Sequence, residues 1–376
     1  MTRVDAARLL STFLDLVRID SPTGSEAACA SYCAEALQAA GCTVRFDDSA
    51  AATGSDTGNL IAILPGTVPS TLGLSAHMDC VEPCRGVVPR VSEGLIVSAG
   101  ETVLGADDKV GLAAAIEVLR CLAESGEDGP TVKAIFTVQE EIGLHGAKQL
   151  SVADSACDLC LVLDADGTPG GIVVGAPTHY TFAAEFTGRA AHAGLEPERG
   201  ISAIRMAVDA ISHMELGKLD SATTANVGSI RSDGATNVVA ARCELTGECR
   251  SLDRERVEAV RDEMDAALKS AADEHGGSVE VVWTREYEGF SAPADDTAVQ
   301  LVSAACEDVG LTPRLYTTGG GSDANVLSAM GVHTLALACG MSGVHGTGEH
   351  LAVADMEALA ALVLAVARRM ASGGVA

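Results

Sequence analysis

The sequence predicts an α/β fold: a doubly wound domain of alternating strands and helices, with a smaller α+β unit inserted into it. Up to about residue 177, apolar runs typical of buried strands alternate with segments of helical periodicity. Between residues 179 and 292 the strands alternate in polarity, as strands with one solvent-exposed face do. From residue 293 the first pattern returns. We therefore expect one domain from residues 1–178 and 293–376, and a second from residues 179–292.

The individual elements follow from periodicity and from turn residues. Before the insert we expect helices at 5–19, 25–40 and 110–122, strands at 60–64, 71–76, 131–138 and 159–163, and a weak hairpin at 87–97. Within the insert we expect strands at 179–188, 223–231, 243–250 and 279–284, and helices at 201–214 and 253–274. After the insert we expect a helix at 297–310, a glycine-rich loop at 318–325, a strand at 334–338 and a closing helix at 354–370.

Composition limits the classes of partner. The chain has 376 residues, 47% of them hydrophobic, and a formal net charge of −27. Nucleic acids and anionic membranes bind basic surfaces, so this acidic balance argues against both. No apolar stretch is long enough to span a bilayer, and the N-terminus lacks the pattern of a secretory leader. We therefore expect a cytoplasmic protein whose 12 cysteines are reduced thiols.

The most informative stretch is the end of the strand at 71–76, which is followed by His77-Met78-Asp79. A one-residue spacer on an extended chain points both polar side chains the same way. In open α/β sheets, ligands bind at the carboxyl ends of the strands. The pair His77 and Asp79 therefore indicates a binding site at this edge, provided that other polar groups gather there.

Further imidazoles and carboxylates follow other strands or stand in neighbouring loops. They are Asp107, Glu140, Glu141, Asp164 and His345. Together with His77 they form a donor set that suits zinc or a similar divalent ion. For Asp107 and its neighbour Asp108, capping of the following helix is the simpler explanation. The residues alone distinguish neither Asp79 from the ligands nor Glu140 from Glu141.

Charge favours two ions over one. Asp107, Glu141 and Asp164 carry three negative charges. One divalent ion leaves this set anionic, whereas two leave it slightly positive, which helps to stabilise a hydroxide. Hydrolytic sites with two metals hold their ions about 3.5–4 Å apart. We therefore expect a dinuclear site.

At these residues the sequence resembles the M20 family of metallopeptidases. The resemblance is carried by His77-Met78-Asp79, Gly105-Ala106-Asp107-Asp108-Lys109, Glu140-Glu141, Asp164 and the late His345. The stretches Gly320-Gly321-Ser322-Asp323-Ala324-Asn325 and Gly247-Glu248-Cys249-Arg250-Ser251-Leu252-Asp253 are most similar to its peptidase-T-like branch. The resemblance implies a zinc-exopeptidase-like catalytic domain, and an insert that acts as a lid and usually mediates dimerisation.

The resemblance also implies a division of the metal ligands. It assigns His77 and Asp164 to one zinc ion, Glu141 and His345 to the other, and Asp107 as the bridge between them. Cobalt or manganese are the alternatives to zinc.

Three more residues receive roles by resemblance. Glu140 becomes the general base that takes a proton from the bridging water, and Asp79 orients a metal-bound histidine. His192 corresponds to a lid histidine that in some members completes a partner subunit's active site and stabilises the oxyanion. Without the resemblance, a solvated loop histidine would be the preferred interpretation of His192.

Substrate-binding positions are implied at Asn237, Arg250, Gly321 and Ser322. Arg250 suits a carboxylate because its guanidinium can donate two parallel hydrogen bonds. A surface ion pair is an equally good interpretation of Arg250 from the sequence alone.

The resulting functional hypothesis is a dinuclear zinc hydrolase that cleaves short peptides, as a peptidase-T-like exopeptidase or aminopeptidase, and forms a homodimer through the lid. One alternative is an aminoacylase- or carboxypeptidase-like amidohydrolase that acts on N-acyl amino acids. An alternative of another class is a metal-binding protein without catalytic activity. That alternative requires a broken base or ligand set, and the sequence shows neither.

Overall fold

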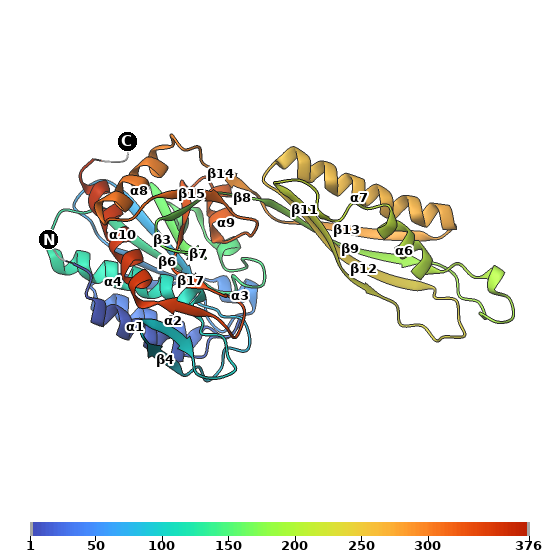
Figure 1. Cartoon of the computed structure of the whole chain (residues 1–376), viewed down its shortest axis with the longest axis horizontal. Coiled ribbons are helices and arrows are strands. Elements are labelled where there is room, and N and C mark those ends of the chain that lie inside the picture. The colour runs from blue at the N-terminus through green and yellow to red at the C-terminus, as the bar shows by residue number, and fades with distance from the viewer. Residues whose placement is uncertain (1–2, 374–376) are drawn as a thin grey trace. The chain divides into compact units, whose positions relative to one another are not determined.

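The computed structural model describes residues 3–373, which form two compact units (Figure 1). The first unit extends to Val174 and also comprises Ser291–Thr317 and the chain from Ser322 onward. The second unit comprises Gly175–Phe290 and Thr318–Gly321. The predicted fold class is confirmed, since an α/β unit with a mixed central sheet accompanies a separate unit with an antiparallel sheet.

The first unit is organised around a nine-stranded sheet. Its order is β1 (Thr43–Phe46), β2 (Leu60–Leu64), β6 (Thr131–Thr137), β3 (Thr71–His77), β7 (Leu159–Ala165), β16 (Thr334–Ala338), β8 (Gly171–Ala176) and β14 (Phe290–Ser291), with β15 (Arg314–Thr317) paired to β8. The strands from β6 to β16 are parallel, whereas β2 and β8 run antiparallel to their neighbours. The parallel strands are the long apolar runs that the sequence predicts, because they are buried on both faces.

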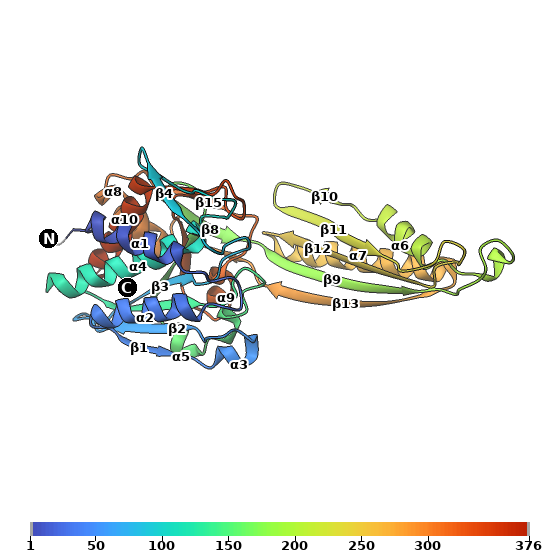
Figure 2. The ribbon, with the colours of Figure 1, turned by 90° about the horizontal axis from the view of Figure 1, so that it is seen from below.

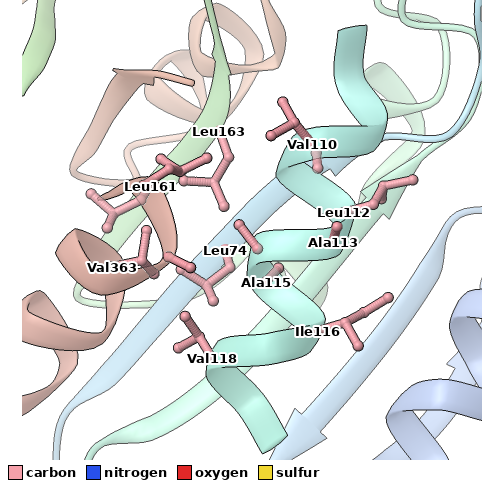
Figure 3. Packing of buried hydrophobic residues seen from close by; sticks show 14 of the residues in the cluster. Leu74, Val110, Leu112, Ala113, Ala115, Ile116, Val118, Leu161, Leu163 and Val363 are labelled. Atoms are coloured by element: carbon pink, nitrogen blue, oxygen red, sulfur yellow. The ribbon is translucent and has the colours of Figure 1, made fainter. Parts of the chain in front are cut away.

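Helices cover this sheet. They are α1 (Ala6–Arg18), α2 (Ala27–Ala39), α3 (Ser49–Thr53), α4 (Ala106–Ser125), α5 (Val152–Ser155), α8 (Thr297–Asp308), α9 (Asp323–Ala329) and α10 (Val353–Ala371), with a 3₁₀ turn at Ala147–Gln149. Figure 3 shows α4 lying across β3, with Ala115 beside Leu74 and with Val363 of α10 on the other side of Leu74. The small alanines let the helix backbone approach the sheet closely. This packing fixes the start of α4 near the end of β3.

A small four-stranded sheet joins two distant parts of the first unit. Its order is β17 (Met341–Ser342), β18 (His350–Ala352), β5 (Leu95–Ser98) and β4 (Pro89–Ser92). The predicted hairpin at 87–97 is thus present as β4 and β5. Its pairing with β18 fixes one end of the loop that contains His345.

The second unit is a five-stranded antiparallel sheet with two helices on one face (Figure 2). The strand order is β10 (Gly217–Lys218), β11 (Thr223–Arg231), β12 (Arg242–Ser251), β9 (Thr178–Thr187) and β13 (Ser278–Tyr287), and the helices are α6 (Ala203–Ser212) and α7 (Arg254–His275), with a 3₁₀ turn at Pro197–Arg199. Met206 of α6, Met264 of α7 and Phe186 of β9 share one buried cluster. The unit therefore has a hydrophobic core of its own.

Some short strands and helices of the structure are not predicted by the sequence patterns. The edge strand β1 is largely exposed, so it lacks the apolar run that marks a buried strand. The predicted glycine-rich loop at 318–325 is wrong at its end, because α9 begins at Asp323 with Ser322 as its N-cap. All twelve cysteines are free in this structure. No helix within residues 3–373 is long and apolar enough to cross a membrane.

Candidate metal centre

The five predicted metal ligands all lie in the first unit, and the topology of the sheet brings them together. β3 ends at His77, β7 carries Asp164 at its penultimate position, and β6 leads directly into the two adjacent glutamates. Because these three strands are parallel, their carboxyl ends lie at the same edge. Asp107 stands at the start of α4, and His345 lies between β17 and β18.

Asp107 occupies the centre of this cluster. Its Oδ1 is 3.1 Å from Nε2 of His77, and its Oδ2 is 3.3 Å from Nε2 of His345. The same nitrogen of His77 is 3.6 Å from Oδ1 of Asp164. The Nε2 of His345 is 3.0 Å from Oε2 of Glu141. One carboxylate thus presents one oxygen to each imidazole, and each imidazole has a second carboxylate beside it.

Two overlapping groups of donor atoms are compact enough to hold a metal ion. One consists of His77, Asp108 and Asp164, and the other of His77, Asp107 and Glu141. Within each group the donor atoms lie within 4.8 Å of one another. The first contains Asp108, for which the sequence alone suggests only a helix cap, and neither group contains His345.

The chemistry of these residues fits divalent cations. Oε1 of Glu141 is buried and has no hydrogen-bond partner within the described chain. Burial raises the pKa of Asp164 to about 7, and hydrogen bonds with Asp107 and Glu141 raise the pKa of His345 to about 10. The raised pKa values mean that these side chains bind protons readily, which compensates part of the negative charge that the buried carboxylates would otherwise carry. Imidazole nitrogens and carboxylate oxygens are the donors that zinc and similar ions prefer.

Asp79 lies on the opposite side of the His77 ring from Asp107 and Asp164. Nδ1–H of His77 donates to the backbone carbonyl of Asp79 at 3.0 Å, and the Asp79 carboxylate lies 3.4 Å from the same nitrogen. A proton on Nδ1 leaves the lone pair of Nε2 free to coordinate a cation. The backbone carbonyl of Asp79 accepts this hydrogen bond, and its carboxylate lies beside the same nitrogen.

The same carboxylate also holds the two glutamates. Oδ1 of Asp79 accepts the N–H of Glu140 at 2.9 Å, and Oδ2 accepts the N–H of Glu141 at 3.3 Å. Glu141 contacts His345, whereas Glu140 belongs to neither compact donor group among residues 3–373. Burial, together with the charge of Asp164, raises the pKa of Glu140 well above its ordinary value. The backbone geometry therefore separates two side chains that are adjacent in the sequence.

Asp108 is one functional residue that sequence reasoning missed. Its Oδ2 accepts the backbone N–H of His77 at 3.2 Å, and its Oδ1 accepts the N–H of Gly111 at 3.1 Å. A Cβ at position 111 would lie 2.4 Å from the carbonyl oxygen of Leu163, so this position requires glycine. The N-cap of α4 is Gly105, and Asp107 and Asp108 have non-helical dihedrals. Asp108 thus holds the N–H of Gly111 within α4 while also anchoring the strand end that carries His77.

Glu349 is a second residue that sequence reasoning left without a role. It is buried, and its carboxylate accepts the N–H of Gly105 at 2.7 Å and the N–H of Asp107 at 2.9 Å. It stands four residues after His345, so it ties the loop of one predicted ligand to the backbone of another. No signal in the sequence marks Glu349 for this role, because its partners lie more than 240 residues away.

The predicted lid residues divide into two groups within the second unit. Asn237 lies beside His192, because the N–H of Ala193 donates to the carbonyl of Asn237 at 2.9 Å. The guanidinium of Arg250 donates to Glu248 at 2.9 Å and to the hydroxyl of Tyr287 at 3.2 Å.

Arg250 also packs near the glycine-rich segment. Its Nη1 is 3.5 Å from the carbonyl oxygen of Gly319, and a Cβ at Gly321 would lie 2.2 Å from the ring of Tyr287. The Nε of Arg250 is buried without a hydrogen-bond partner in the described chain. Ser322, the remaining predicted substrate contact, accepts the N–H of Ala324 at 3.3 Å and so caps α9.

Arg250 and His192 lie at opposite ends of the second unit's sheet. Arg250 pairs with His179 at one end of β9 and β12, and Arg242 pairs with Thr187 at the other end, where the chain continues toward His192. Arg242 and Arg250 are eight residue steps apart along an extended strand, which corresponds to about 26 Å. The resemblance implies that both Asn237 and Arg250 contact the substrate, but within one chain they are far apart.

Known proteins resemble this chain in both sequence and fold. Residues 73–369 match the model of peptidase family M20/M25/M40. The crystal structure of aminopeptidase PepT from Bacillus cereus is 40% identical, covers 98% of this chain and 99% of that one, and superposes with a TM-score of 0.92. A tripeptidase from Staphylococcus aureus is 37% identical, covers 98% of this chain and 99% of that one, and superposes with a TM-score of 0.94.

A third relative extends the likeness over nearly the whole chain. The protein YqjE of Bacillus subtilis is 41% identical over 364 residues, which are 96% of this chain and 98% of that protein. The predicted resemblance, including its peptidase-T-like branch, is therefore confirmed. With its cluster of histidine and carboxylate side chains at one edge of the catalytic sheet, this chain belongs to the peptidase family M20/M25/M40.

Proposed function

We propose that the protein is a dinuclear zinc exopeptidase that acts on short peptides. The observation that carries the proposal is the central carboxylate of Asp107, with one oxygen against His77 and the other against His345. The similarity to a PepT aminopeptidase and to a tripeptidase, each over 98% of this chain, favours a short peptide as the substrate.

The proposed ligands form two sets, one on each side of Asp107. His77 and Asp164 lie on one side of it, and Glu141 and His345 lie on the other. When bound there, two divalent ions polarise the scissile carbonyl and lower the pKa of water. Asp79 keeps the His77 ring in the orientation that directs Nε2 toward this centre.

Glu140 is the general base of the proposed reaction. It is buried, stands next to a ligand, and belongs to neither compact donor group within residues 3–373. Its carboxylate takes a proton from the attacking water and passes it to the nitrogen of the leaving amine. The hydrogen bond from its own N–H to Asp79 holds the backbone from which it acts.

The separation of the lid residues favours a site built from two chains. An extended tripeptide spans roughly 10 Å, far less than the length of strand that separates Arg250 from the end near His192. One substrate can therefore contact Arg250 of one chain and His192 of another, but not both residues of the same chain. We infer a homodimer in which His192 and Asn237 come from the partner.

The local geometry of His192 suits an oxyanion donor. Its Nδ1 accepts the N–H of Gly194 at 3.1 Å, so the neutral ring carries its proton on Nε2. His192 is exposed, which leaves that donor available to a substrate oxygen.

Replacing His192 by alanine is expected to lower kcat about 10²–10³-fold, because an oxyanion donor is lost, while metal content stays unchanged. His213→Ala, at an exposed histidine of the same unit, serves as the control and should retain wild-type kcat. Mixing inactive Glu140→Gln chains with inactive His192→Ala chains should restore activity, because mixed dimers contain one intact site. Subunit exchange is verified by mass spectrometry of labelled chains. Exchange without recovered activity would rule out the role of His192 in the partner's site.

The proposed substrate class is tested on the purified protein loaded with zinc, cobalt or manganese. Dipeptides, tripeptides and N-acyl amino acids are screened side by side, with free amino groups measured as product. We expect hydrolysis of short peptides that have a free N-terminus. Preferential hydrolysis of N-acyl amino acids would favour the amidohydrolase alternative, and binding of metal without any turnover would favour the non-catalytic one.

A further inference from the structure

Three consecutive backbone N–H groups in the turn after β6 donate to buried carboxylates. Those of Glu140 and Glu141 donate to Asp79, as described above. The third, from Gln139, donates to Oε1 of Glu26 at 3.2 Å. Glu26 lies 113 residues earlier in the chain and belongs to none of the groups considered so far. The turn that carries the proposed base is thus held by two separate carboxylates.

Glu26 is fully buried at the start of α2, with an exposed fraction of 0%. Its Oε1 also accepts the N–H of Gly24 at 2.8 Å, and its Oε2 accepts the hydroxyl of Ser55 at 2.5 Å. A buried carboxylate is costly unless its oxygens receive hydrogen bonds. Both oxygens of Glu26 receive them, so the side chain is held firmly in one orientation.

The segment 21–26 contains one of the two carboxylates that hold the turn, Glu26, and contacts the other, Asp79. While Glu26 receives the N–H of Gln139, the hydroxyl of Thr23 donates to Oδ2 of Asp79 at 2.9 Å. This segment therefore couples the two carboxylates that hold residues 139–141. None of its side chains belongs to the compact donor groups among residues 3–373.

The supported backbone has an unusual conformation. Gln139 has a φ of +52°, a left-handed value that residues other than glycine adopt only where the surroundings hold them. The hydrogen bond to Glu26 holds its N–H, and the N–H of His145 donates to its carbonyl at 3.0 Å. The residue that follows this strained position is Glu140, the proposed base.

We propose that Glu26 is a positioning residue for Glu140, acting through the backbone of Gln139 rather than through the substrate or the metal ions. The inference rests on the proposed role of Glu140 as general base. A shift of about 1 Å in a reacting group can lower a rate about 100-fold. Loss of the Glu26 bond therefore lowers kcat while leaving the five ligands in place.

Two substitutions distinguish the effect of the length of the Glu26 side chain from the effect of its charge. Glu26→Asp keeps the charge but withdraws the carboxylate by about one carbon–carbon bond, roughly 1.5 Å. Glu26→Gln removes the charge but keeps an oxygen at the same distance, and the Ser55 hydroxyl can turn to accept from the amide. Glu117 provides the matched control, because it is also fully buried and its carboxylate accepts the N–H of Asp5 at 2.9 Å.

We expect Glu26→Asp to lower kcat about 10- to 100-fold, with KM and metal content close to wild type. Glu26→Gln should stay within about threefold of the wild-type kcat. Glu117→Asp should lose thermal stability but keep its kcat per folded chain. Hydrogen exchange should show faster exchange at the amides of residues 139–141 in Glu26→Asp and not in Glu117→Asp.

Three results would overturn the inference. They are wild-type kcat in Glu26→Asp, equal losses of kcat in Glu26→Gln and Glu26→Asp, and loss of metal in parallel with activity. Failure of the proposed function gives a different result, because the wild-type chain itself would then hydrolyse no peptide. That result would contradict the proposed function and the positioning role of Glu26 together. An active wild type with an inactive Glu140→Gln variant and an unaffected Glu26→Asp variant would overturn the positioning role alone.

Discussion

Replacing Glu140 by glutamine is expected to lower kcat about 10²–10⁴-fold while both metal ions remain bound. Glutamine has the same shape as glutamate but cannot accept the proton of the attacking water. Glu140 belongs to neither compact donor group among residues 3–373, and it is not one of the five proposed ligands. Its backbone stays anchored, because the N–H that donates to Asp79 is unchanged. Steady-state kinetics and metal analysis of the same preparation give the two quantities.

The adjacent substitution Glu141→Gln is the matched control. Glu141 has one oxygen 3.0 Å from His345, and its other oxygen is buried without a partner in the described chain. An amide in this place coordinates a divalent cation more weakly than a carboxylate does. We therefore expect a chain that holds fewer ions. Equal metal loss in both variants would show that the roles of the two glutamates are assigned wrongly.

Replacing Asp107 by alanine is expected to abolish high-affinity binding at both metal positions. Asp107 lies between His77 and His345, with one oxygen toward each, so its removal takes a ligand from both sets and leaves the two ions to repel each other. Peptide hydrolysis should be lost with the metal. Isothermal titration of the metal-free protein with zinc measures the stoichiometry and the affinities.

Asp164→Asn provides the contrast for that prediction. Asp164 lies 3.6 Å from His77 and belongs to only one of the compact donor groups among the described residues. We therefore expect this variant to keep the ion that Glu141 and His345 hold, and to bind one ion per chain. The two-metal proposal fails if the wild-type chain reaches full activity with a single ion.

The gathering of histidine and carboxylate side chains at one edge of the sheet could be predicted because their positions follow from local pattern. His77 follows a long apolar strand, and Asp164 lies near the end of another, so the burial of the strand itself places each polar side chain at one edge of the sheet. The parallel arrangement then brings those edges together, as alternating strands and helices generally do. The second unit was predictable for a similar reason, since its alternating strands need a hydrophobic core of their own.

The residues that support the centre could not be predicted in the same way. Glu349 holds the backbone of Asp107 from 242 positions away, and Glu26 holds Gln139 from 113 positions away. In the sequence each of them is an isolated acidic residue, with no periodicity to distinguish it from a solvated one. Their effect depends on burial and on backbone donors that come close only after the sheet has formed.

By itself, the sequence determined the fold class and the edge of the sheet where histidine and carboxylate side chains gather, because burial of apolar strands is a local property of the chain. Only the tertiary structure decided which contacts each of these residues makes. Of the two adjacent glutamates, Glu141 contacts His345 and Glu140 does not. Asn237 lies beside His192 and far from Arg250. Those outcomes depend on backbone dihedrals and on strand register. Both are set by hydrogen bonds between segments that are distant in the sequence, which a linear pattern does not contain.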